Sequence, residues 1–142
     1  MEVIVLGASG TYPTADAAAS GFLVIAGDTK VWLDAGPGTF QNLQRHIEFH
    51  DVSAVVLSHM HLDHVLDFYA FHYALAYDLA SRGPKALPVF APKGSEPYLL
   101  SLRPDGFEGH FNFEVIDSVE SLRLGQMDWT FALTRHPQTC LA

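Results

Sequence analysis

Residues 53–64 read SAVVLSHMHLDH, an apolar run followed at once by three histidines and an aspartate. The apolar run has the length and β-branched composition of a short buried strand. Its polar residues should therefore fall in a loop at the carboxyl end of that strand, which is the edge where open α/β sheets bind ligands. The stretch predicts an α/β fold with a functional site at one edge of its sheet.

The polar side chains of this loop are of the kinds that bind a divalent metal ion. His59 and His61 alternate along extended backbone, so both imidazoles can face the same side. Asp63 and His64 follow as the chain turns into a helix, and can point toward a second position nearby. Imidazole nitrogen and carboxylate oxygen are ligands of zinc, while manganese or iron would also suit a position with a carboxylate. The alternative interpretation is a polar loop with incidental histidines.

Outside this stretch the sequence alternates predicted strands and helices, as an α/β domain does. The predicted strands are residues 2–7, 21–26, 30–35, 87–92, 112–117, 121–124 and 128–134. The predicted helices are a segment capped by Thr39 that runs through Ile47, a longer one over 65–81, and a short one over 95–102.

Composition limits the class of protein. With 142 residues, 49% of them apolar and 17% charged, the chain fits a single globular domain. A net charge of −8 argues against non-specific nucleic-acid binding, which needs a surplus of basic residues. The single cysteine, Cys140, fits a reducing compartment. No stretch reaches the roughly 18 apolar residues of a membrane span, so we expect a cytoplasmic protein with no membrane partner.

The motifs resemble those of the metallo-β-lactamase family. HMHLDH at 59–64 matches the HxHxDH signature of that family. The segments LGASGTYPT at 6–14, SGFLV at 20–24 and LDAGPGT at 33–39 occur in the order and spacing of one branch. That branch includes ribonuclease Z, which processes tRNA 3′ ends, and small bacterial phosphodiesterases that act on cyclic nucleotides. The resemblance implies an αββα sandwich and a metal-dependent hydrolase.

The resemblance also implies roles for individual residues. His59, His61 and His136, the last in TRHPQT, would bind a first metal ion, and Asp63 and His64 a second. The alternative for His136 is a surface histidine before a proline.

Two aspartates would have further roles by the same resemblance. Asp34 would orient a ligand without binding metal. Asp63 would also be catalytic, by taking up a proton from the attacking water.

Three functions are compatible with these motifs. The first is a phosphodiesterase that uses a metal-activated water on a small, cyclic-nucleotide-like phosphodiester, which the acidic composition favours over nucleic acid. The second is a ribonuclease Z-like endonuclease that processes tRNA 3′ ends. The third is a non-catalytic half-domain that binds metal.

The pattern of the family continues beyond the last residue of this sequence. The chain ends six residues after His136, before the aspartate and histidine that would complete the second site. We therefore expect residues 1–142 to be the N-terminal part of an αββα domain. A half-domain would expose one face of its sheet, so we expect either a homo-oligomer or a missing C-terminal half.

Overall fold

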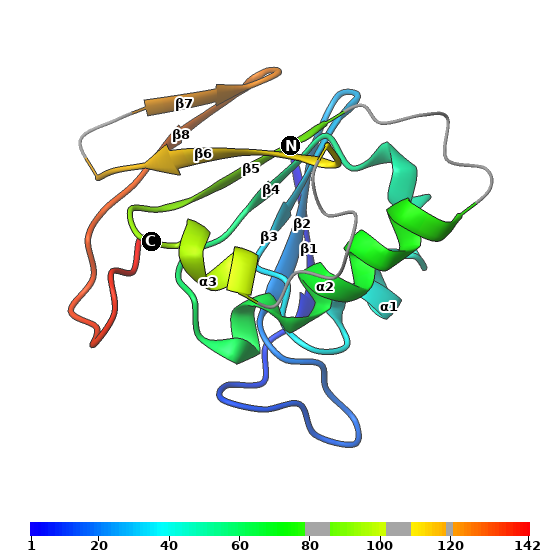
Figure 1. Cartoon of the computed structure of the whole chain (residues 1–142). Helices are drawn as coiled ribbons and strands as arrows, with labels where there is room; N and C mark the ends of the chain where they lie inside the picture. Colours follow the sequence, from blue (N-terminus) through cyan, green and yellow to red (C-terminus); the bar gives the residue numbers. More distant parts are fainter. Residues whose placement is uncertain (79–85, 102–108, 119–120) are drawn as a thin grey trace.

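The apolar run at 53–58 forms a central strand of a six-stranded mixed sheet (Figure 1). The computed structural model describes residues 1–78, 86–101, 109–118 and 121–142. In spatial order the strands are β1 (Glu2–Gly7), β2 (Gly21–Ala26), β3 (Thr29–Leu33), β4 (Ala54–Val56), β5 (Leu87–Pro92) and β6 (Phe111–Ile116). The spatial order is the sequence order, so each strand pairs with the one that precedes it.

The pairing of neighbouring strands changes from antiparallel to parallel at β3. β1, β2 and β3 are antiparallel neighbours, and β2 and β3 are joined by a tight turn in which Gly27 has a φ of 57°. From β3 onward, β4, β5 and β6 are parallel. Because Leu33 lies beside Val56 in this parallel pair, the residues that follow β3 and β4 emerge together at one edge of the sheet.

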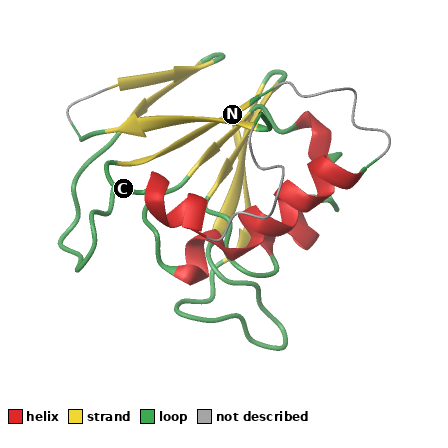
Figure 2. Cartoon of the chain, viewed as in Figure 1, coloured by secondary structure: helices red, strands yellow, loops and turns green. Residues whose placement is uncertain are grey.

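Helices cover one face of this sheet (Figure 2). They are α1 (Thr39–Leu43), α2 (Leu62–Tyr77) and α3 (Glu96–Ser101), with a short 3₁₀ helix at Phe49–Asp51. The core between the two layers includes Trp32 of β3 and Phe68 and Phe71 of α2, all fully buried. Among the helices that the structure describes, none is long and apolar enough to cross a membrane.

A two-stranded hairpin packs on the other face. Its strands are β7 (Ser121–Leu124) and β8 (Met127–Thr130). A second apolar cluster joins Val31, Val56 and Ile116 of the sheet to Met127 of the hairpin and Leu141 of the C-terminal segment. The described residues therefore form an α layer, a sheet and part of a further β layer, as expected for the N-terminal part of an αββα sandwich.

Most of the predicted elements are confirmed, but several of their ends differ; the last strand, β8, for example ends at Thr130 and not at the predicted residue 134. α2 begins at Leu62, three residues earlier than predicted, and its predicted end at 81 lies outside the described residues. The predicted cap at Thr39 is wrong: this residue is already helical, and its hydroxyl donates to the Gly36 carbonyl at 2.6 Å. Gly38, with a φ of 90°, makes the turn into α1 instead, and α1 ends at Leu43.

Candidate metal centre

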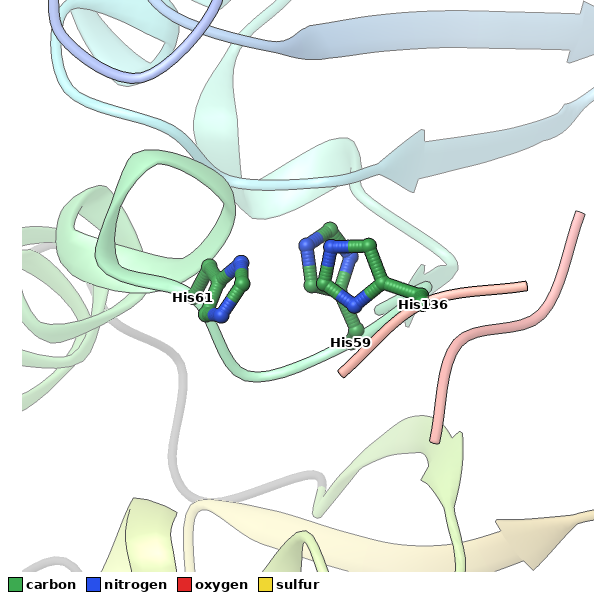
Figure 3. A group of neighbouring side chains, drawn as sticks. All are labelled: His59, His61 and His136. Atoms are coloured by element: carbon green, nitrogen blue, oxygen red, sulfur yellow. The ribbon is translucent and has the colours of Figure 1, made fainter. Parts of the chain in front are cut away.

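Three histidines meet at the carboxyl end of β4 (Figure 3). His59 lies in the loop after β4, His61 directly precedes α2, and His136 lies in the C-terminal segment after β8. One ring nitrogen of each lies within 4.8 Å of those of the others. Zinc–nitrogen bonds of about 2.0–2.1 Å place tetrahedral ligands roughly 3.3 Å apart, so small ring movements would suffice to bind one ion. Three imidazoles are a set of ligands that fits zinc.

The C-terminal segment that carries His136 is folded back on itself. The backbone amides of Ala132 and Ala142 each donate to the carbonyl of the other, at 2.8 and 2.9 Å. Near the end of this segment, the Leu141 amide donates to the Ser58 carbonyl at 3.0 Å. This last bond attaches the segment directly to the residue before His59, and so brings His136 to the loop after β4.

The ring of His136 makes a local contact with its own loop. Its Nδ1 accepts a hydrogen bond from the Gln138 amide at 3.3 Å. A neutral imidazole whose Nδ1 is an acceptor carries its proton on Nε2. If a metal ion binds Nε2 of His136, the ring proton must therefore move to Nδ1. If the ion binds Nδ1, the hydrogen bond from the Gln138 amide must break.

Asp34 organises the polar groups behind the histidines. It follows β3, is 6% exposed and has a φ of 56°, a left-handed conformation that Asp adopts more readily than most residues. Its Oδ1 accepts from the Ser58 amide at 2.8 Å. Its Oδ2 lies 2.8 Å from both the Ser58 hydroxyl and Nδ1 of His64. Asp34 thus contacts the loop that carries the histidines without belonging to the three-histidine group.

His59 is held by the residue that precedes it. Its Nδ1 lies 2.9 Å from the Ser58 hydroxyl. Burial, followed by the proximity of His64, lowers the pKa of His59 from 6.5 to about 4. The ring is therefore neutral at physiological pH, which is the form that binds metal.

Asp63 and His64 lie beside the three-histidine group and form a pair. The His64 ring is 4.1 Å from that of His59, and its Nε2 is 3.5 Å from Oδ2 of Asp63. That spacing suits two ligands of one ion. Burial alone would lower the pKa of His64, but the hydrogen bond and charge of Asp34 and the charge of Asp63 outweigh it and raise the pKa.

The loop between β1 and β2 contacts Asp63. The Thr11 amide donates to Oδ2 of Asp63 at 2.9 Å. Thr11 has a φ of 68°, so that a β-branched residue is held in the left-handed region. Thr11 and Asp34 are the non-glycine residues with positive φ in the described part of the chain, and both contact this site. The loop after β1 therefore helps to position the Asp63 carboxylate.

An apolar cavity of about 330 Å³ borders the site on the hairpin side of the sheet. Asp34, Ser58, His59 and His64 form its polar end. The rest of its wall is mainly apolar and includes Ile116, Trp129, Phe131 and Leu141. The polar network around Asp34 therefore has an apolar environment, in which hydrogen bonds between fixed partners are strengthened.

The structure brings together the residues that sequence motifs single out. His59, His61 and His136 form the group predicted for the first metal, and Asp63 and His64 are neighbours as predicted for the second. Sequence reasoning missed the role of Ser58 and the contact between Thr11 and Asp63. Ser58 could have been found from its place between a buried strand and His59, whereas nothing in the N-terminal loop indicates a contact 52 positions away.

Comparisons with known proteins agree with this geometry. Residues 29–140 match the model of the β-lactamase superfamily domain. The chain is 29% identical over 143 residues to a probable metallo-hydrolase, YhfI of Bacillus subtilis, covering all of this chain and 57% of that protein. It is 41% identical over 61 residues to ribonuclease Z of Methanopyrus kandleri, covering 42% of this chain and 22% of that protein.

Solved structures show the same fold. The crystal structure of the metallo-β-lactamase fold protein YhfI superposes with a TM-score of 0.85 at 28% identity, over 98% of this chain and 55% of that one. A diphosphatase of the PhnP family superposes with a TM-score of 0.73 at 16% identity, over 98% and 59%. The chain thus spans little more than half the length of YhfI, a share that fits part of a larger domain. It belongs to the β-lactamase superfamily and has the metallo-β-lactamase fold.

Proposed function

We propose that this chain carries the first metal site of a metal-dependent hydrolase, with zinc as the ion and a small phosphodiester as the substrate. The observation that supports this most is the meeting of His59, His61 and His136 from two distant segments. Manganese or iron would be alternatives where Asp63 contributes a ligand. The proposal also agrees with the name of the relative YhfI, a probable metallo-hydrolase.

The residues of this chain would divide the work as follows. A zinc ion held by the three histidines would supply a Lewis acid and lower the pKa of a water molecule at its open side. Asp63, whose Oδ2 is held by the Thr11 amide, would accept the proton that this water loses. Asp34 would keep the His64 ring oriented by its contact with Nδ1 of that ring.

The acidic composition supports a small substrate. A net charge of −8 opposes the approach of a long polyanion unless basic residues are gathered at its site. The cyclic-nucleotide-like class is therefore our first choice. Processing of tRNA 3′ ends is the second candidate, because two relatives named ribonuclease Z are 41% identical to this chain over 42% and 49% of its length. A non-catalytic half-domain that binds metal is the third.

Zinc titration tests the metal site itself. We expect the chain to bind one zinc ion tightly. The three-histidine group offers three imidazoles to this ion, whereas Asp63 and His64 offer only two ligands to a second one. His59→Ala and His136→Ala should each weaken zinc binding strongly in a chelator competition assay. His46→Ala removes an exposed histidine away from the site and should leave the affinity unchanged. Absence of zinc uptake by the wild-type chain would contradict the proposal.

Hydrolysis assays test the substrate class. The whole protein, loaded with zinc, should hydrolyse bis(p-nitrophenyl) phosphate and a cyclic nucleotide faster than it cleaves a tRNA precursor, and residues 1–142 alone should turn over poorly. Preferential cleavage of the tRNA precursor would favour the second candidate. A protein that binds zinc and hydrolyses none of the three would favour the non-catalytic interpretation.

A further inference from the structure

The Ser58 hydroxyl lies between two groups that compete for its single hydrogen. Its Oγ is 2.8 Å from Oδ2 of Asp34 and 2.9 Å from Nδ1 of His59. A hydroxyl can donate to only one of them and accept from the other. The direction of these two bonds therefore decides which nitrogen of His59 carries the proton.

Counting hydrogens settles the direction. As a carboxylate, Asp34 has no hydrogen to donate, so the 2.8 Å contact is a hydrogen bond only if Ser58 is the donor. The opposite arrangement would place lone pairs of two oxygens against each other at that distance. Once the hydroxyl donates to Asp34, its oxygen can only accept from His59. Nδ1 of His59 then carries the proton, and Nε2 keeps its lone pair.

The backbone of Ser58 is held on both sides, which keeps the hydroxyl in place. Its amide donates to Oδ1 of Asp34 at 2.8 Å, and its carbonyl accepts from the Leu141 amide at 3.0 Å. The same Oδ2 of Asp34 also lies 2.8 Å from Nδ1 of His64. One carboxylate therefore sets the tautomer of two histidines, directly for His64 and through Ser58 for His59.

We propose that Ser58 is a positioning residue whose hydroxyl transmits the orientation of Asp34 to His59 and keeps Nε2 of His59 free for a metal ion. This inference rests on the proposed metal site. It adds a residue outside the predicted ligand set, and it holds for the metal-free protein as well. Loss of an outer partner of this kind typically weakens metal binding about 10–100-fold.

Three serine variants test the role of the hydroxyl. Ser58→Ala should weaken zinc binding about 10–100-fold in a chelator competition assay. Ser58→Thr keeps a hydroxyl and should recover most of the affinity. Ser53→Ala is the matched control: Ser53 precedes β4 as Ser58 follows it, and its hydroxyl accepts from the Lys30 amide at 3.0 Å, away from the histidines. Its zinc affinity should equal that of the wild type.

A second readout requires no metal. In ¹⁵N NMR spectra of the metal-free protein at neutral pH, His59 should carry its proton on Nδ1 in the wild type and in Ser58→Thr. In Ser58→Ala the ring should shift toward the Nε2-protonated tautomer, because Nδ1 has lost its acceptor. This measurement also verifies that each variant is folded, from the dispersion of its spectrum.

The outcomes separate this inference from the proposed function. If the wild type binds no zinc, the metal site is wrong, and the tautomer of His59 still tests the hydroxyl bridge. If Ser58→Ala keeps either its zinc affinity or the Nδ1-protonated ring, the positioning role is overturned. It is also overturned if Ser53→Ala weakens zinc binding as much as Ser58→Ala, because the loss would then reflect a general loosening around β4.

Discussion

At the scale of single residues, the site depends on residues that are not themselves predicted metal ligands. Asp34 and Thr11 both have left-handed backbone. Asp34 contacts Ser58 and His64, and the Thr11 amide contacts Asp63. Such conformations persist only where surrounding contacts stabilise them. The geometry of the site is therefore built by its neighbours as much as by its ligands.

Asp34→Asn should weaken zinc binding about 10–100-fold while leaving the protein folded. Asn tolerates positive φ, so the turn after β3 is preserved. With the NH₂ group of the Asn in the place of Oδ2, its hydrogens would face the Ser58 hydroxyl and Nδ1 of His64. His64 would then lose its acceptor directly, and His59 would lose its orientation through Ser58. Chelator competition measures the affinity and thermal unfolding checks the fold. Unchanged affinity would mark Asp34 as a residue that only forms the turn.

Asp67 should make the stability of the metal-free protein depend on pH. Its Oδ2 accepts from the Phe40 amide at 2.8 Å, but burial outweighs this and other backbone hydrogen bonds and raises its pKa above 3.8. Between 3.8 and that raised value, the folded state binds the proton and the unfolded state does not, so this residue's contribution to stability grows as pH falls and is lost as pH rises.

The measurement is the free energy of unfolding of wild type minus that of Asp67→Asn, with a chelator present. This difference should increase as pH is lowered from 7 toward 4, because Asn does not titrate. A difference that is constant or that decreases would contradict the raised pKa of Asp67.

At the scale of elements, the sequence predicts best what depends on local pattern. β4 and the loop after it follow from an apolar run that ends in polar residues, and the β2–β3 hairpin follows from two apolar runs around Gly27. The Thr39 cap failed because Gly38 can adopt positive φ and make the turn itself. The bridge through Ser58 could not be derived from sequence, since it depends on the parallel pairing that places the ends of β3 and β4 together.

The C-terminal segment should respond to metal at Gln138. If an ion binds Nε2 of His136, the ring proton moves to Nδ1; if it binds Nδ1, it takes the lone pair directly. In both cases the Gln138 amide loses the acceptor that it has at 3.3 Å. Its amide proton resonance should therefore move upfield on zinc titration.

The Thr134 amide is an internal reference for this shift, since it donates to the Cys140 carbonyl at 3.0 Å within the same segment. Zinc binding that leaves the Gln138 resonance in place would show that His136 is not a ligand.

At the scale of the whole molecule, the two faces of the sheet are covered unequally. The helices cover the apolar cluster that contains Trp32 and Phe68, here called the helix-side cluster. The cluster that contains Met127 of the hairpin is the hairpin-side cluster. On the hairpin side of the sheet, Val3 and Val5 of β1 remain 55% and 61% exposed. Val3 is paired with Val24, which belongs to the hairpin-side cluster, so these two residues continue that apolar surface. This edge of the sheet is where the predicted homo-oligomer would form or where more of the domain would pack.

Val5→Lys should reduce self-association of the chain, measured by sedimentation velocity, without changing its zinc affinity. The control is Val115→Lys, a residue of β6 with a similar exposure of 57% whose neighbour Ala91 belongs to the helix-side cluster. A wild-type chain that sediments as a monomer at all concentrations would show the prediction of a homo-oligomer to be wrong.

The change from antiparallel to parallel pairing at β3 also has a consequence for the order in which the strands form during folding. The β2–β3 hairpin closes over two residues, and such hairpins form within about 1–10 μs. Parallel strands need long crossovers. The contact between His59 and His136 closes a loop with 76 residues between them (60–135), which costs more chain entropy. During refolding, strand signals in circular dichroism should therefore appear before the capacity to bind zinc. The onset of zinc binding would then report when His136 reaches His59.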